Sequence, residues 1–347
     1  MDIARRFSQN PILRPSDLKP SMEGMKIECL LNPGVFTFDN KTWLLIRVAE
    51  MPVQEGGKIS FPVFDESGKI RILTFDKSDP HLDLSDPRVI NYKGQDYLTT
   101  LSHLRLMCST DGIRFTEPHG YAPIPGQTRH EAYGIEDCRV VKVGDTYQLT
   151  FTEVSSYGVG VGLLQTRDWK TYEHRGMIFP PHNKDCAIFE EPINGKYYAL
   201  HRPSSPQFGG NYIWIAESPN MIYWGNHKCI ATSRKGYWDS ARIGAGAAPI
   251  KTKEGWLEIY HGATEQHHYA LGALLLDLKD PSKVIARSEE PIMKPTEPYE
   301  LTGFMGNVVF TNGHIVDGDR IRMYYGASDE VICGADLSIN EILKTLK

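Results

Sequence analysis

The stretch YGIEDCRVVKVGDTYQLTF, residues 133–151, combines two features on which the interpretation of the whole chain depends. Its second half is a hairpin signal, in which a turn at Gly144 precedes a strand of aromatic and apolar residues. Its first half places two acids and an arginine, Glu136, Asp137 and Arg139, directly before this hairpin. Charged groups beside a buried strand are costly unless they are paired or used, so we expect them to have a function.

The hairpin pattern recurs six times along the chain. Its copies are FDNKTWLLIRV (38–48), NYKGQDYLTTL (91–101), KVGDTYQLTF (142–151), INGKYYALHRP (193–203), KEGWLEIYHGA (253–263) and DGDRIRMYYGA (317–327). Their turns are 54, 50, 51, 60 and 63 residues apart. A repeat of this length that supplies a small sheet each time is typical of a β-propeller. Six hairpins predict either six blades or five, with the first and last hairpins sharing one blade.

We therefore expect an all-β fold in which residues 26–347 form a single propeller domain. Residues 337–346 have the pattern of a short C-terminal helix. Residues 1–25 are rich in proline and charge and are expected to be an arm, ordered by packing on a partner subunit. This arm is the reason for expecting a homo-oligomer.

The composition excludes several classes of partner. The net charge of -5 offers no basic surface for nucleic acid or for an anionic membrane. No apolar run reaches the roughly 18 residues of a membrane span, and the N-terminus lacks the apolar core of a signal peptide. The six cysteines are scattered without a CxxC pair, which is typical of reduced thiols. We expect a cytoplasmic protein.

Polar residues recur at one end of most of the predicted hairpins, so a propeller would gather them in one central funnel. The candidates are Arg47, Asp86, Arg88, Glu136, Asp137, Arg139, Lys184, Asp185, Glu190, Glu191, Arg202, Arg242, His261 and Asp329. Carboxylates bind sugar hydroxyls, and arginine binds phosphate bidentately. This mixture indicates a sugar bound beside an oxyanion. The acids are not grouped at ligand spacing, so no metal is expected.

At these residues the sequence resembles glycoside hydrolase family 130, the inverting β-mannoside phosphorylases and related β-mannosidases. The resemblance is carried, in family order, by NPGVF (32–36), LLIRVAE (44–50), GIEDCRV (134–140), NKDCAIFEEPINGKYYALHRP (183–203), IGAGAAPIKTKEGWLEIYHGA (243–263), YALGALLLDLKDPSKVI (269–285) and YYGASDE (324–330). The chain departs from the family's EDPR motif because Cys138 replaces the proline. The resemblance implies a five-bladed propeller, which favours the shared blade, and no cofactor beyond inorganic phosphate as co-substrate.

The resemblance also implies a role for each matching residue. Asp137 matches the general acid, which in this family is thought to deliver its proton through the 3-hydroxyl of the bound mannose. Asn32, Arg47 and Asp329 match positions that hold the non-reducing mannose. Phosphate binding is expected at Lys184, Arg202, Arg242, His261 and Tyr269. The remaining substrate-binding candidates are Asp86, Arg88, Glu136, Arg139, Asp185 and Glu191.

The residues leave the reaction open between phosphorolysis and hydrolysis. An inverting hydrolase needs an acid and a base roughly 6.5–9.5 Å apart, whereas a phosphorylase needs the acid and cations that hold phosphate. Glu190 or Glu191 could supply the base, so an inverting β-mannosidase is one alternative, and a propeller that binds mannosides without catalysis is another. A cytoplasmic location favours phosphorolysis, because a sugar phosphate formed there is retained. The long segment 86–131 favours a short β-1,2-mannobiose substrate by reshaping the acceptor subsite.

Overall fold

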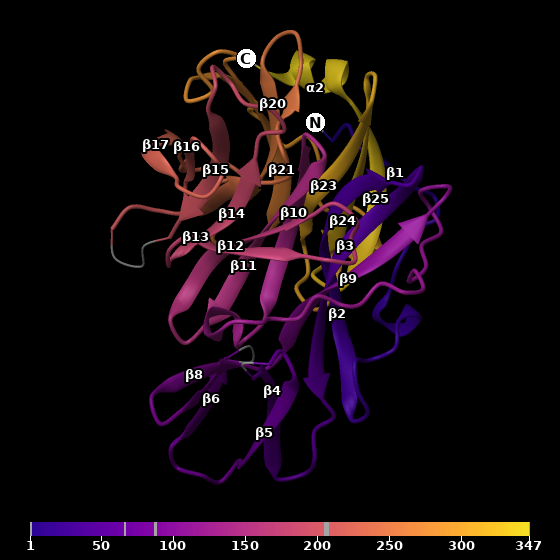
Figure 1. Cartoon of the computed structure of the whole chain (residues 1–347), viewed down its shortest axis with the longest axis vertical. Coiled ribbons are helices and arrows are strands. Elements are labelled where there is room, and N and C mark those ends of the chain that lie inside the picture. The colour runs from indigo at the N-terminus through magenta and orange to yellow at the C-terminus, as the bar shows by residue number, and fades with distance from the viewer. Residues whose placement is uncertain (1, 66, 87–88, 205–207, 347) are drawn as a thin grey trace.

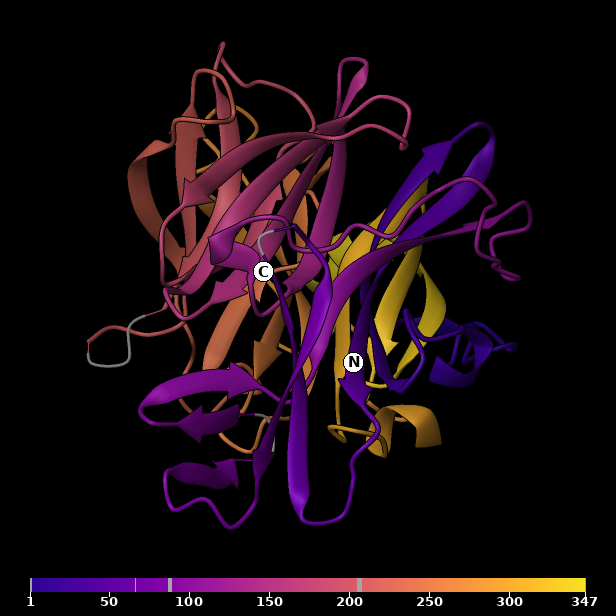
Figure 2. The ribbon, with the colours of Figure 1, turned by 60° about the horizontal axis from the view of Figure 1, so that its bottom comes forward.

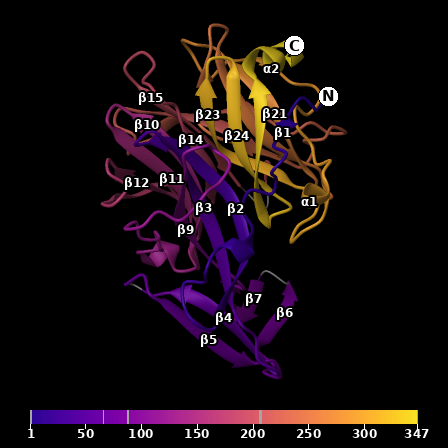
Figure 3. The ribbon, with the colours of Figure 1, turned by 90° about the vertical axis from the view of Figure 1, so that its right-hand side faces the viewer.

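The computed structural model describes residues 2–65, 67–86, 89–204 and 208–346, and most of them lie in antiparallel strands (Figure 1). Five sheets form the body of the molecule, and two small sheets form a lobe that projects from one end of it (Figures 1 and 3). Figure 2 turns the lobe toward the viewer, with the magenta-to-orange sheets on one side of the body and the yellow sheet on the other. The expected all-β class is confirmed.

The sheets follow one another along the chain. The first two in the body contain β2 (Met25–Phe38), β3 (Lys41–Pro52) and β9 (Leu101–Ser109), then β10 (Ile135–Val143), β11 (Thr146–Ser155), β12 (Gly158–Thr166) and β13 (Glu173–Phe179). The third contains β14 (Asn183–Ile188), β15 (Tyr197–Pro203), β16 (Ile213–Ser218) and β17 (Gly225–Ala231). The fourth contains β18 (Arg242–Ala245), β19 (Ile250–Lys251), β20 (Trp256–Ala263), β21 (Tyr269–Leu276) and β22 (Val284–Arg287). The fifth contains β1 (Arg5–Arg6), β23 (Val309–Asp317), β24 (Arg320–Ala327) and β25 (Val331–Ser338).

The lobe and the short helices complete the chain. The lobe contains β4 (Lys58–Phe64), β5 (Ile70–Asp76), β6 (Leu82–Asp86), β7 (Val89–Tyr92) and β8 (Gln95–Leu98). The helices are η1 (Pro15–Asp17), η2 (Arg129–Glu131), α1 (Pro298–Leu301) and α2 (Ile339–Thr345). The C-terminal helix predicted for residues 337–346 is thus confirmed as α2. Among the described residues, no helix is long and apolar enough to cross a membrane.

Five of the six predicted hairpins belong to the body, and their aromatic residues form its core. Trp43, Tyr147, Trp256 and Tyr325 are buried, because each packs in an apolar cluster formed by two neighbouring sheets. The quoted hairpin turns at Gly144, whose φ of 62° suits a residue without a Cβ. Burial of such large rings supplies much of the apolar contact between neighbouring sheets.

The hairpin at Gly94 lies outside the body. The turn near Gly94 joins β7 to β8 in the lobe, outside the five sheets of the body. The first and last hairpins lie in different sheets, β2 with β3 and β23 with β24, so the expectation that they share one blade is wrong. The sequence pattern of a hairpin records local turn chemistry and does not say which sheet the hairpin joins.

The first strands of the body's sheets meet in the middle of the molecule. β10 contacts β2 on one side and β14 on the other, and β14 in turn contacts β18. β23 contacts β2, and also β21 of the fourth sheet. Each sheet therefore lies against the next, and the fifth lies against the first.

The N-terminal segment packs on its own chain. β1 pairs with β25, and the side chains of Leu13 and Leu18 are buried in the body. Farther along, Ser21 donates its backbone N–H and hydroxyl to the buried carboxylate of Glu50, which also accepts from Arg105 Nη2 at 2.6 Å. Contacts within the chain therefore order the segment that we expected a partner subunit to order.

The pair formed by Glu50 and Arg105 is buried, so breaking it is expected to be costly. Arg105→Met leaves an unpaired carboxylate in the core and should lower the free energy of unfolding by about 3–5 kcal/mol. Arg114→Met is the control, because Arg114 pairs with Asp111 at the surface, and such pairs contribute at most about 1 kcal/mol. Urea titration of both variants measures the difference. Equal losses in the two variants would contradict the buried role of Arg105.

Candidate active site

A pocket of about 330 Å³ lies where the central strands meet, and side chains from all five sheets or their connecting turns line it. It contains eleven of the residues selected from the sequence: Asn32, Arg47, Glu136, Asp137, Lys184, Asp185, Arg202, Arg242, His261, Tyr269 and Asp329. These residues are separated by up to 297 positions in the chain, 329 minus 32. The fold therefore brings together the predicted central site.

Three of the polar side chains are placed by β-bulges. Asn32, Asp137 and Asp185 have left-handed φ angles of 36°, 50° and 54°, and strand register shifts at each of them. Asn and Asp adopt this conformation at lower cost than other residues with a Cβ. A bulge turns the side chain out of the regular alternation of the strand. The motifs NPG, EDC and KDC thus direct an amide or a carboxylate into the pocket.

The acidic side of the pocket is organised by one guanidinium group. Arg47 Nη2 lies 2.8 Å from Glu136 Oε1, Arg47 Nη1 lies 3.2 Å from Asp137 Oδ1, and Arg47 Nε donates to Ser102 at 2.9 Å. Asn32 Nδ2 donates to the same Oδ1 of Asp137 at 3.1 Å. Within the described part of the chain no donor reaches Oδ2 of Asp137, so a ligand can use that oxygen.

The two aspartates nearest Arg47 differ in their affinity for a proton. Burial favours the neutral form of Asp137, but the positive charges of Arg47 and Lys184 outweigh burial and lower its pKa overall. For Asp329, burial raises the pKa to about 6, and the negative charge of Asp137 acts in the same direction against Arg47. In the free protein, Asp329 therefore binds a proton more readily than Asp137 does.

The opposite side of the pocket is cationic around one ionised aspartate. Asp185 Oδ2 lies 3.1 Å from Arg202 Nη1 and 3.3 Å from His261 Nε2. Burial alone would raise the pKa of Asp185, but Arg202 and His261 hold it well below its usual range. Burial lowers the pKa of His261 to about 4, so its ring is neutral at neutral pH.

Several donors on this side have no protein partner. Arg202 Nε and Arg242 Nε are buried, and no hydrogen-bond acceptor in the described residues reaches them; the buried Nδ1 of His261 also has no partner among these residues. Arg242 is held by Tyr269, whose hydroxyl lies 3.3 Å from Nη1. Unpaired buried donors on charged groups are costly, and an anionic ligand would satisfy them. The geometry therefore suits an oxyanion such as phosphate.

Three of the selected residues do not line this pocket: Arg139, Glu190 and Glu191. Arg139 lies buried beneath the pocket and donates to the backbone carbonyls of Asp137, Ala245 and Gly246 at 2.7–3.0 Å. Its assignment to sugar binding is corrected to support of the pocket floor. Glu191 forms an ion pair with Lys251, away from the pocket, so its assignment to the substrate is also corrected.

Glu190, the proposed hydrolytic base, lines a different pocket beside Val140 and Lys251. Neither Glu190 nor Glu191 therefore faces Asp137 across the site. The acids of IFEEP follow the end of a strand at 188, where the chain has left the central pocket. Arg88 and the side chain of Asp86 lie outside the described residues.

Sequence reasoning missed the apolar and lobe-derived parts of the pocket. Leu98, Thr99 and Thr100 reach it from the end of the lobe, and Phe304 and Met305 reach it from the connection between α1 and β23. Cys29, Leu31, Ala49, His267, Val308 and Phe310 complete the lining. Such residues are indistinguishable from ordinary core or loop residues in one sequence. Only their position in the fold identifies them.

One group of potential metal ligands lies outside the pocket, at Glu131, Glu153 and His174, whose ligand atoms lie within 4.8 Å of one another. His174 Nδ1 accepts the N–H of Gly176 at 3.0 Å, so the ring proton lies on Nε2, which donates to Glu131 at 2.7 Å. A protonated Nε2 has no lone pair for a metal. The group therefore fits a buried hydrogen-bonded pair and does not fit a metal site.

The comparisons with known proteins identify the family of the chain. The family model of glycoside hydrolase family 130, described as β-1,4-mannooligosaccharide phosphorylase, matches residues 79–347. A β-1,2-mannobiose phosphorylase of Listeria innocua serovar 6a is 44% identical and covers 99% of this chain and 98% of its own. A 1,2-β-oligomannan phosphorylase of Thermoanaerobacter sp. strain X514 is 40% identical over 70% of this chain and 80% of its own.

A solved structure extends the likeness to three dimensions. The structure of β-1,2-mannobiose phosphorylase from Listeria innocua with bound β-1,2-mannobiose matches this one with a TM-score of 0.94. The two sequences are 43% identical, and the match covers 99% of this chain and 98% of the other. The chain therefore belongs to glycoside hydrolase family 130, as the resemblance of its motifs implied.

The raised pKa of Asp329 predicts that its charge destabilises the free protein. The pKa of this carboxyl is about 6 in the folded protein and about 3.9 in the unfolded chain. Between these two pH values the folded state binds more protons, so the free energy of unfolding falls as pH rises. Asp329→Asn should therefore be more stable than wild type at pH 7.5 by about 1–2 kcal/mol, and the gain should vanish below about pH 4.5. Thermal unfolding across this range measures it.

The control is Asp168→Asn. Hydrogen bonds from the backbone of Thr171 and Lys170 lower the pKa of Asp168 to about 2, so this substitution should reduce stability at neutral pH. A loss of stability in Asp329→Asn at pH 7.5 would show that the carboxylate of Asp329 is not strained by its neighbours.

Proposed function

We propose that the chain is an inverting phosphorylase. It would cleave β-1,2-mannobiose or a short β-1,2-mannoside with inorganic phosphate, giving α-mannose 1-phosphate and a shortened sugar. The observation that carries this proposal is the division of one pocket into an acidic side at Asp137 and Asp329 and a cationic side at Arg202 and Arg242, with unpaired buried donors on the cationic side.

The β-1,2 linkage is proposed from the names of two relatives and from the share of this chain that they match. The Listeria innocua and Thermoanaerobacter proteins described above are both named for β-1,2-linked mannosides, and the first matches this chain from end to end. The description of the family model names a β-1,4-linked substrate, but that model matches only residues 79–347. The lobe residues 98–100, which line the pocket, suit the role in acceptor choice that we expected of the long segment 86–131.

The geometry supports a concerted displacement. A phosphate oxygen held by the cationic side would attack C1 of the mannose, and the C1–oxygen bond to the leaving sugar would break with its electron pair remaining on that oxygen. The leaving oxygen takes a proton, which the family resemblance assigns to Asp137 through the 3-hydroxyl of the mannose. A mannose hydroxyl that replaces Arg47 or Asn32 at Asp137 would reduce the contacts that keep this acid ionised.

The placement of the acids disfavours the hydrolytic alternative. A hydrolase needs a base that activates water opposite the acid, and Glu190 and Glu191 both lie outside this pocket. Asp185 faces the site, but Arg139, Arg202 and His261 surround it, so it is a weak base. A non-catalytic mannoside-binding protein has no use for the unpaired donors on the cationic side of the pocket, opposite Asp137.

We also propose that the five sheets of the body are the blades of a five-bladed propeller, a single domain that follows an N-terminal arm of residues 1–25. The ring of contacts among the central strands supports this, and so does the pairing of β1 with β25, which joins the two ends of the chain in one sheet. The cytoplasmic location, the homo-oligomer and the lack of any cofactor beyond phosphate stay predictions. Activity that persists in EDTA would agree with the last of these.

Phosphate dependence tests the reaction. The protein should convert β-1,2-mannobiose only when phosphate is present, with α-mannose 1-phosphate as product. Arg202→Met should raise the KM for phosphate by about 10–100-fold, the worth of a hydrogen bond to a charged group, and change the KM for the sugar less. Chromatography of products with and without phosphate measures this. Equal turnover without phosphate would support the hydrolase, and binding without turnover would support the non-catalytic alternative.

Asp137 should be the one acid on which turnover depends. Asp137→Asn keeps the shape of the side chain and removes its proton, so kcat should fall about 10²–10⁴-fold while mannose still binds. Glu136→Gln is the matched neighbour, because it keeps a contact with Arg47 and leaves the acid intact; its kcat should fall much less. Steady-state kinetics and calorimetry measure both variants. A loss in Glu136→Gln as large as in Asp137→Asn would contradict the assignment.

A further inference from the structure

Residues 302–308, which we call the pocket loop, bring apolar side chains to an otherwise polar site. They connect α1 to β23 and contribute Phe304, Met305 and Val308 to the pocket lining. Phe304 is 45% exposed, although it is a large apolar residue on the wall of a pocket. An exposed aromatic ring beside sugar-binding groups offers a flat apolar face to a sugar ring.

The pocket loop is attached at both of its ends. Met305 N donates to the carbonyl of Ser328 at 2.9 Å, which places the Phe304 end of the loop beside Asp329. Val308 N donates to the carbonyl of Glu300 at 3.1 Å. The position of Phe304 therefore depends on two elements, the turn that carries Asp329 and the short helix α1.

Helix α1 has only four residues, so side-chain contacts have to stabilise it. Glu300 supplies them and is fully buried. Its Oε2 accepts the N–H groups of Thr296 and Glu297 at 2.8 and 3.1 Å, and its Oε1 accepts the hydroxyl of Tyr325 at 2.7 Å. The helix and the start of the pocket loop are thus organised around one carboxylate.

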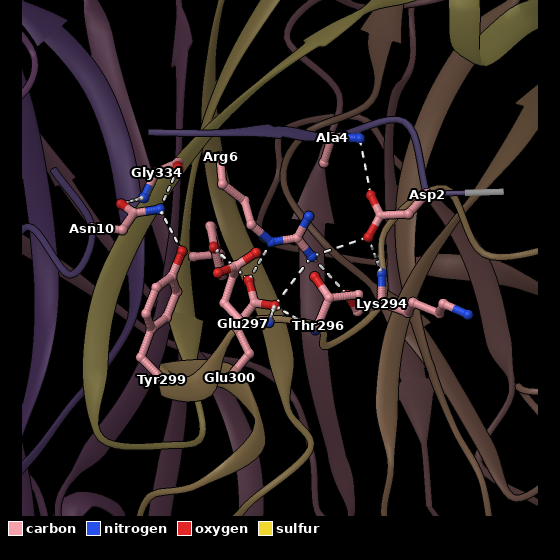
Figure 4. Close-up of polar contacts among 11 residues, drawn as sticks. Asp2, Ala4, Arg6, Asn10, Lys294, Thr296, Glu297, Tyr299, Glu300 and Gly334 are labelled. Carbon is pink, nitrogen blue, oxygen red and sulfur yellow. Dashed lines mark hydrogen bonds and ion pairs between the residues drawn. The ribbon is translucent and has the colours of Figure 1, made fainter. Parts of the chain in front are cut away.

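Arg6, from the other end of the chain, neutralises this carboxylate (Figure 4). Its Nε lies 2.7 Å from Glu300 Oε1, and its Nη2 lies 3.1 Å from Oε2. Nη2 also donates to Asp2 at 3.0 Å and to the carbonyl of Lys294 at 2.7 Å. A planar guanidinium that engages both oxygens fixes their orientation as well as their charge.

We infer that Arg6 is a positioning residue for the substrate pocket, acting through Glu300 on the pocket loop, and that Phe304 is a contact surface for the sugar. The inference rests on the proposed function and extends it. The N-terminal segment would then be part of the active-site architecture, although Arg6 itself does not line the pocket. Phosphate-binding residues such as Arg202 lie on other strands, so the effect should fall mainly on the sugar.

The test compares neighbouring arginines on one strand. Arg6→Met and Arg6→Lys remove or weaken the contact with Glu300, whereas Arg5→Met removes only a surface ion pair with Glu341 on α2. Arg6→Met should raise the KM for β-1,2-mannobiose about 3–10-fold with a smaller change in the KM for phosphate, and Arg6→Lys should give an intermediate value. Arg5→Met should match wild type in both.

Phe304→Ala tests the loop without a change to its anchor. It should raise the KM for the sugar by a similar factor while leaving the Tm near that of wild type, because Phe304 is exposed. In the double variant Arg6→Met/Phe304→Ala the two increases should not multiply, since both substitutions act on one contact. Multiplying effects, or Arg6 variants that lose Tm with no change in KM, would overturn the inference while leaving the phosphorylase intact. A wild-type protein that cleaves no β-mannoside would overturn the proposed function, and the inference with it.

Discussion

The site depends on one backbone device, the left-handed bulge in a central strand. A regular strand alternates its side chains between two faces, and both faces of these central strands are occupied by neighbouring sheets or strands. A bulge breaks this alternation and can turn a side chain into the pocket. Asn32, Asp137 and Asp185 lie at such bulges in three different sheets. The side chain at such a position has to tolerate positive φ, which restricts it largely to glycine, asparagine and aspartate.

This restriction links the shape of the fold to the chemistry of the pocket. Strands that need a bulge near the molecular centre receive carboxylates and amides there, and these bind sugar hydroxyls well. Buried carboxylates then require cations, which arrive from ordinary strand positions such as Arg47 and Arg202. Arg139 lies below the pocket, where it donates to the backbone carbonyl of Asp137, in the bulge of β10, and to that of Ala245 in β18.

Part of the fold can be predicted from the sequence, because hairpin turns and buried aromatic strands have local sequence signals. The strand class, the C-terminal helix and eleven of the pocket residues followed from those signals and the family motifs. The sheet that a hairpin joins depends on long-range contacts. The sequence pattern therefore does not distinguish the hairpin at Gly94, which lies in the lobe, from the hairpins of the body. Glu190 was misplaced because one sequence does not show where a strand leaves the pocket. Phe304 was missed because nothing local separates an exposed pocket phenylalanine from a core one.

Within the described residues, several charged groups of the free pocket lack a full set of partners, among them Arg202, Arg242 and Asp329. The proposed chemistry requires such groups, because they are the ones that a substrate and phosphate would contact. Burial raises the pKa of Asp329, and the negative charge of Asp137 raises it further, while Asp137 is kept ionised by Arg47 and Lys184. An acid with these neighbours stays ionised, so the proposed role of Asp137 requires a ligand that changes its contacts. Phosphate on the cationic side would offset the positive charge that keeps Asp137 ionised, and so make it easier to protonate. Binding of the nucleophile would thereby help to prepare the acid, which couples the two halves of the pocket through their electrostatics alone.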